Sequence, residues 1–230
     1  MPSPLLVAVA WVAIALGVGC AVEIVYDMYG RGFRQRMTIM EAVWPVTALY
    51  LGPVATWGYR RFGRPMSGRW QRDHDVDTAP DRPAWATTAV GVSHCGAGCT
   101  LGDIGAEFAV FALGLTVAGT ALWAEMLSDF TVALALGIVF QYFAIAPMRG
   151  LGLRSGLAQA AKVDVLSLVS FEIGLFAWMA LMWFVFFPDP HLSPLSPVYW
   201  LFMQIGMIIG FATAWPTNAW LIRRGIKEPM

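Results

Sequence analysis

Residues 5–26 read LLVAVAWVAIALGVGCAVEIVY, and Glu23 is the one charged side chain among them. A helix of about 20 mostly apolar residues crosses the ~30 Å hydrocarbon core of a bilayer. The stretch therefore predicts a membrane-spanning helix. It also decides the fold class, because in lipid only helices and closed barrels satisfy every backbone polar group.

The composition of the whole chain agrees with a lipid environment. Of 230 residues, 58% are hydrophobic and 13% are charged. A soluble domain has roughly 45–50% apolar and about 25% charged residues, so a soluble enzyme and a disordered protein are excluded. The formal net charge of zero argues against a nucleic-acid partner. The predicted fold is an all-α, polytopic transmembrane helix bundle in the lipid bilayer.

Six apolar stretches are long enough to span the membrane: 5–26, 38–59, 101–124, 130–148, 163–187 and 198–222. The shorter apolar stretch 84–98 is interpreted as a re-entrant or half-length helix, or as an N-terminal extension of the third span. The predicted domains are a two-span extension (1–59), a polar cytoplasmic linker (60–83) and a four-span core (84–230).

Basic residues predict the orientation, because cytoplasmic loops are enriched in Lys and Arg. With both termini cytoplasmic, in a multi-pass protein of the inner (plasma) membrane, the cytoplasmic side holds Arg60, Arg61, Arg64, Arg69, Arg72, Arg82, Arg149, Arg154, Lys162, Arg223, Arg224 and Lys227. The opposing loops, expected at 125–129 and 188–197, contain no basic residue. Only Arg31, Arg34 and Arg36 break the rule.

The stretch Ser93–Glu107, SHCGAGCTLGDIGAE, is the one that indicates chemistry. Cys95, Cys99, Asp103 and Glu107 are spaced by four, which places them on one face of a helix. An acid within the membrane is costly and marks a functional-site hypothesis.

Thiolates and imidazole are ligands for copper(I) and zinc, so we expect a soft-metal site at His94, Cys95 and Cys99. Asp103 and Glu107 are expected to orient the ligands or to take up their protons. Thioethers also bind copper(I), although each methionine in an apolar helix is more often packing. The methionines concerned are Met126, Met148, Met179, Met182, Met203 and Met207.

Three more polar residues extend the predicted proton or ion path. Asp164 and Glu172 are eight residues apart, on nearly the same face of the fifth span. Asp164 also suits a helix N-terminus, whereas Glu172 lies mid-span and needs a partner, a proton or water. Asn218 follows Pro216, so it either satisfies carbonyls that the proline leaves free or joins the polar site.

These residues resemble the bacterial membrane-protein family catalogued as domain of unknown function 4396. The resemblance covers about residues 85–228 and rests on three motifs: His94-Cys95-x-x-Gly98-Cys99-x-x-Gly102-Asp103, Asp164-Val165-Leu166-Ser167-Leu168 with Glu172, and Pro216-x-Asn218-x-Trp220-Leu221-Ile222-x-x-Gly225. It implies that Asp103, Asp164 and Glu172 are family acids, and that the first two spans are an extension. It also implies relatives alongside copper-handling proteins, but no established activity.

Three functions stay open at this point. The chain could bind a soft metal for transport, delivery or sensing, with a homo-oligomer or a metal-handling protein as partner. It could be a thiol redox protein that acts on a quinone or on a partner disulfide. It could be an accessory or structural subunit. No nucleotide-binding loop or nucleophile elbow is present, so we expect no nucleotide cofactor, and enzymatic activity is disfavoured.

Overall fold

The computed structural model describes residues 2–149 and 152–227, without the side chains of 144–149, 159, 160, 162 and 163. It confirms the all-α helix bundle, and its long helices are apolar enough to lie in a lipid bilayer. Within the described residues, five helices are long and apolar enough to span a membrane: α1 (Pro4–Tyr29), α5 (Ala84–Leu113), α6 (Ala121–Arg149), α7 (Leu153–Leu181) and α8 (Pro197–Arg223). The side chains of Met148, Arg149 and Lys162 lie outside this description.

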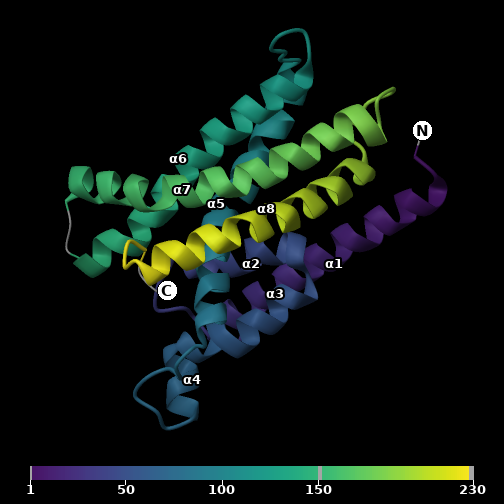
Figure 1. Cartoon of the computed structure of the whole chain (residues 1–230). Coiled ribbons are helices and arrows are strands. Elements are labelled where there is room, and N and C mark those ends of the chain that lie inside the picture. The colour runs from purple at the N-terminus through teal and green to yellow at the C-terminus, as the bar shows by residue number, and fades with distance from the viewer. Residues whose placement is uncertain (1, 150–151, 228–230) are drawn as a thin grey trace.

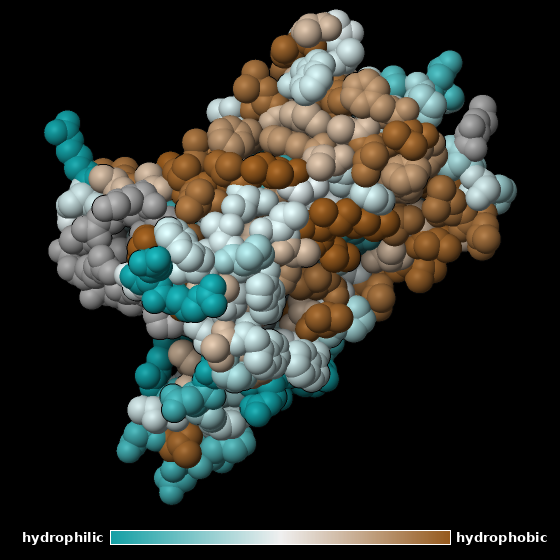
Figure 2. All heavy atoms as spheres, viewed as in Figure 1, coloured by the Kyte–Doolittle hydropathy of each residue, from teal (hydrophilic) through white to brown (hydrophobic). Residues whose placement is uncertain are grey.

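The bundle is apolar on the outside and polar at its centre. Brown, hydrophobic side chains cover much of the visible helical surface, and teal ones gather over the loop that holds α4 (Gly68–Asp73) (Figures 1 and 2). In the most apolar stretch of α1, 17% of the residues are buried, whereas 56% are buried in the corresponding stretch of α5. Helix α5 is therefore the central helix, and it contacts α2, α6, α7 and α8.

The predicted second span is broken into two short helices. Helix α2 (Met40–Leu51) ends at Gly52, and α3 (Pro53–Gly58) begins directly after it. The φ angle of Gly52 is 51°, a conformation that glycine adopts without steric cost, and Pro53 suits the first turn of the next helix. At 1.5 Å per residue, α2 covers about 18 Å, only part of the ~30 Å core.

Contacts with α1 show that α2 and α3 form a re-entrant hairpin. The tip of the hairpin lies at the middle of α1, where Gly52 faces Leu16. Both legs return to the C-terminal end of α1. At that end Tyr29 donates a 2.9 Å hydrogen bond to Glu41, and Tyr59 donates a 3.0 Å hydrogen bond to Asp27. The stretch expected as a span at 38–59 is therefore not one continuous helix, because a break at Gly52 turns the chain back.

The hairpin brings the loops before and after it, 30–39 and 60–83, to the same end of the bundle. Arg36 hydrogen-bonds Gln71, and Arg34 makes two hydrogen bonds to Glu41, of 2.6 and 2.8 Å. These bonds to Glu41 raise the pKa of the Arg34 guanidinium. We call this end, which also holds the C-terminal end of α8, the basic end, and the opposite end the far end. The three arginines that broke the orientation rule lie at the basic end.

The two termini lie at opposite ends of the bundle (Figure 1). Helix α1 runs along the bundle once, whereas α2 and α3 together turn back at Gly52. The N-terminal extension packs against the core, since Gln204 of α8 donates a 2.6 Å hydrogen bond to the carbonyl of Leu49.

The third and fourth spans begin and end elsewhere than predicted. The stretch 84–98 is the N-terminal part of α5, which was one of the two interpretations. The turn that follows α5 is 114–120, not 125–129, and its backbone turns at Gly114 (φ 61°) and Gly119 (φ 82°). Glu125 and Asp129 were expected in an opposing loop. They lie on α6 and are buried.

Two glycines let α5 approach α6 closely. A Cβ built on Gly102 would lie 2.7 Å from the backbone nitrogen of Ala133, and one on Gly98 would lie 3.1 Å from the Cα of Gly137. Such small residues are typical of helix contacts in membranes. They hold the cysteine-and-acid face of α5 against its neighbours.

Replacing Gly102 by alanine is expected to destabilise the protein. The new methyl group would meet α6 backbone, which cannot move aside cheaply, and overpacking costs about 1–3 kcal/mol. The melting temperature in detergent should fall by about 2–4 °C per kcal/mol. Gly105→Ala on the same helix is the matched control, because a Cβ there meets nothing within 4 Å. Equal melting temperatures of the two variants would contradict the close contact.

Candidate functional site

Helix α5 carries a buried stripe of two thiols and two carboxyls. Cys95, Cys99, Asp103 and Glu107 are each at most 1% exposed. The two thiols are free and lie next to each other. At 1.5 Å per residue, the stripe from Cys95 to Glu107 extends about 18 Å along the bundle. The sequence prediction of one polar face on this helix is thus realised in the interior.

Helix α7 adds two carboxyls that face this stripe. Their spacing had predicted only that they share one face of their own helix. Asp164 is 2% exposed and lies beside the thiol of Cys95. Glu172 is 1% exposed and lies beside the thiol of Cys99, where it also interacts with Asp103. Each cysteine therefore has a carboxyl group next to it.

Helix α6 contributes two acids that the sequence analysis had assigned to a loop. Asp129 is fully buried and interacts electrostatically with Asp103 and Glu107. Glu125 lies one turn earlier on α6 and interacts with Glu107. The signal that could have found them is their spacing of four, the same spacing that identified the stripe on α5.

One buried tyrosine of α8 faces the acids nearest the far end. Tyr199 is 1% exposed and interacts with Glu107, Glu125 and Asp129. Its hydroxyl group makes no hydrogen bond of normal length within the described part of the chain. Tyr199 therefore places a polar hydroxyl group next to the acids of α5 and α6.

Together these groups form a continuous line through the bundle, which we call the polar column. From the basic end to the far end, it consists of Asp164, Cys95, Cys99, Glu172, Asp103, Asp129, Glu107 and Glu125. The residues follow one another along the column. Within the described residues, no three His, Cys, Asp or Glu side chains converge closely enough to hold a metal ion at once. The thiols and carboxyl groups are instead distributed along the length of the bundle.

The carboxyl groups of the column are short of partners. Both oxygens of Asp103, Glu107, Asp129 and Glu172 lack a hydrogen bond among the described residues. The single Lys or Arg side chain that is buried among the described residues is Lys227. An isolated buried carboxylate is strongly disfavoured, so each of these groups must bind a proton, water or a cation.

The basic end of the column is closed by Asn218 and Lys227. Asn218 is fully buried and donates hydrogen bonds to Ser167 (2.7 Å) and to the carbonyl of Ala214 (2.9 Å), while its oxygen accepts one from Lys227 (2.8 Å). Asn218 therefore joins the polar site, which was one of its two expected roles. The carbonyl that Pro216 leaves free is that of Ala212, whereas Asn218 donates to that of Ala214.

His94 is buried at the basic end but lies apart from the thiol pair. Its ring packs edge-on against Phe140, with ring centroids 6.1 Å apart. Neither ring nitrogen has a hydrogen-bond partner in the described residues. The structure therefore gathers Cys95 and Cys99, and does not bring His94 into one group with both of them.

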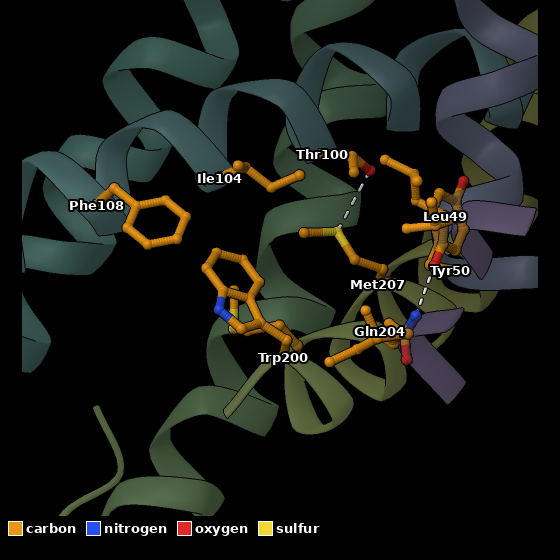
Figure 3. Close-up of a pocket in the computed structure, with 11 residues that line it drawn as sticks. Leu49, Tyr50, Thr100, Ile104, Phe108, Trp200, Gln204 and Met207 are labelled. Atoms are coloured by element: carbon orange, nitrogen blue, oxygen red, sulfur yellow. Dashed lines mark hydrogen bonds between the residues drawn. The ribbon is translucent and has the colours of Figure 1, made fainter. Parts of the chain in front are cut away.

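An apolar cavity of about 370 Å³ lies beside the polar column, between α1, α2, α5 and α8 (Figure 3). Phe108 and Trp200 stack along it with ring centroids 5.1 Å apart, and the hydroxyl of Thr100 donates to the sulfur of Met207 over 3.6 Å. Tyr50 lines the cavity and also lies beside the two thiols. Because the walls are almost entirely apolar, a bare cation is better accommodated in the column.

Comparison with known families places most of the chain in one family. Residues 84–227 match the family model described as Domain of unknown function (DUF4396). The matched region begins with α5 and ends at Lys227, so it contains the whole polar column. The searches of curated proteins and of solved structures gave no match.

Proposed function

The chain belongs to the DUF4396 family, and from the polar column we propose that it moves a cation across the membrane in exchange for protons. The observation that carries this proposal is the row of buried carboxyl groups, four of which have no hydrogen bond on either oxygen among the described residues: Asp103, Glu107, Asp129 and Glu172. Such groups in a membrane typically mark ion pathways and proton relays. A purely structural role would favour partners for each carboxyl, because an unpaired one lowers stability.

The thiol pair points to a soft cation as the cargo, and copper(I) is the best candidate. Copper(I) prefers sulfur ligands, and Cys95 and Cys99 supply two adjacent thiols. Thiols release protons when they bind a metal. Asp164 and Glu172, next to the two thiols, are placed to accept these protons.

We further propose that the basic end faces the cytoplasm and that the N-terminus lies on the opposite side of the inner membrane. The support is the positive-inside rule, which the arginines of both loops around the re-entrant hairpin now follow. In this orientation α1 begins on the outer side of the membrane and ends on the cytoplasmic side. The polar column leads from the cytoplasmic side toward the outer side.

Copper uptake by vesicles tests the function. Purified protein in lipid vesicles should take up copper(I) faster than protein-free vesicles when a pH gradient is imposed, and Na⁺ should not be taken up at the same rate. Uptake equal to that of protein-free vesicles, in both directions of the gradient, would contradict the proposal.

The thiol redox alternative makes a different prediction. It requires a functional disulfide between accessible thiols, whereas Cys95 and Cys99 are free and buried. Trapping of thiols in cells under oxidant stress separates the two functions. Cysteines that stay reduced favour metal handling, and a disulfide that forms and is reduced again favours the redox function.

A further inference from the structure

The last described residue, Lys227, is completely buried although it lies beyond the end of α8. The chain turns back after Arg223, with a φ angle of 67° at Gly225, and the backbone of Ile226 bonds the carbonyl of Leu221 at 3.0 Å. Lys227 then enters the bundle and is 0% exposed. A lysine in this position is costly unless its ammonium group is well solvated by protein oxygens.

Three oxygens from three helices surround this ammonium group. Its Nζ atom donates to the carbonyl of Gly91 on α5 at 3.1 Å and to Oδ1 of Asn218 on α8 at 2.8 Å. The carboxylate of Asp164 on α7 lies 3.8 Å away. Carbonyl, amide and carboxylate oxygens are the ligands that hard cations prefer.

The amide of Asn218 is held with its oxygen toward the cation. Both hydrogens of the amide are engaged, by Ser167 and by the carbonyl of Ala214, so the oxygen is left for Lys227. The distance from Nζ of Lys227 to Oδ1 of Asp164, 3.8 Å, is longer than a hydrogen bond, so this ion pair is loose. The carbonyl, the amide and the carboxylate thus all present an oxygen to the same point between three helices.

We propose that Gly91, Asn218 and Asp164 form a binding site for a monovalent cation, which the ammonium group of Lys227 fills as a tethered cation. Asp164 also borders the thiol of Cys95, so the filled site closes the basic end of the polar column. The segment after α8 must withdraw before a cargo ion passes this end. The closing role rests on the proposed function, whereas the cation site does not.

Chemical rescue tests the cation site on the purified protein. Lys227→Ala should melt at a lower temperature than the wild type, and methylammonium should restore about 2–4 °C of the loss. Tetramethylammonium at the same ionic strength is the control, because it has no N–H to donate and is larger. The wild type, whose site is filled, should respond equally to the two salts. An equal change in the melting temperature of Lys227→Ala with methylammonium and with tetramethylammonium would overturn the proposed cation site.

Labelling of Lys227 serves if Lys227→Ala does not fold. In Asp164→Asn, which replaces the carboxylate of the site by a neutral amide, an amine-acylating reagent should modify Lys227 faster than in the wild type. Lys162, the other lysine of the sequence, is the internal reference within the same sample. An unchanged ratio of Lys227 to Lys162 labelling would overturn the tethered-cation proposal.

Flux measurements separate the two proposals. Lys227→Met should raise the rate of copper uptake into vesicles if the tethered cation closes the column. If methylammonium restores the melting temperature of Lys227→Ala but neither the wild type nor a variant takes up copper, the cation site is retained and the proposed function is overturned. If the wild type takes up copper and Lys227→Met takes it up at the same rate, the proposal that Lys227 closes the column is overturned.

Discussion

Glu172→Gln is expected to reduce cation flux roughly tenfold or more, because the carboxyl group that stabilises a passing cation and exchanges its proton is lost, and a loss of about 1.4 kcal/mol corresponds to a factor of ten. Glu172 lies mid-column beside Cys99 and Asp103, and both its oxygens lack hydrogen-bond partners among the described residues. Glutamine has nearly the same shape, so the path stays open while the carboxylate that stabilises a passing cation is removed. The measurement is copper uptake into vesicles at equal protein content.

The stability of the same variant separates a functional role from a structural one. Replacing an unpaired buried carboxyl by a neutral group removes a desolvation cost, so the melting temperature should stay equal or rise. Glu23→Gln is the matched control, because Glu23 is paired with Arg60 at the surface of the bundle. Loss of flux in both variants, or a large fall in melting temperature for Glu172→Gln, would argue against the column.

The second large effect concerns the thiols. Cys95→Ser/Cys99→Ser is expected to lower bound copper(I) from about one equivalent per chain to background, because hydroxyls are poor ligands for a soft cation. Elemental analysis of the purified proteins measures it. Cys20→Ser is the control, since Cys20 lies on α1 in a separate hydrophobic cluster. If the double variant and the wild type bound equal amounts of copper, the two thiols would not be the binding site of the cargo.

Much of the site could be predicted from spacing alone. The stripe on α5 follows from a repeat of four residues, and Asp164 and Glu172 follow from the same rule on α7. Helices α1 and α8 differ by at most a few residues from the spans expected at 5–26 and 198–222. Periodicity specifies such elements because each is a single uninterrupted helix.

Three features could not be predicted because they depend on tertiary contacts or on one backbone angle. The hairpin requires a positive φ at Gly52, which composition does not distinguish from an ordinary helix glycine. Glu125 and Asp129 were interpreted as a loop because charges usually mark one, and only the packing of α6 against α5 shows that they are inside. Lys227 was counted as an orientation signal, and only its contacts place it in the core.

The claim that the column exchanges a cation for protons is tested most directly by measuring both ions in one vesicle preparation. Vesicles that contain the purified wild-type protein and an internal pH indicator are supplied with copper(I), and copper uptake and internal pH are followed together. The expected result is copper entry with a matching rise in internal pH, both reduced to the same extent by Glu172→Gln. Copper entry with no change in pH beyond that of protein-free vesicles would contradict the exchange.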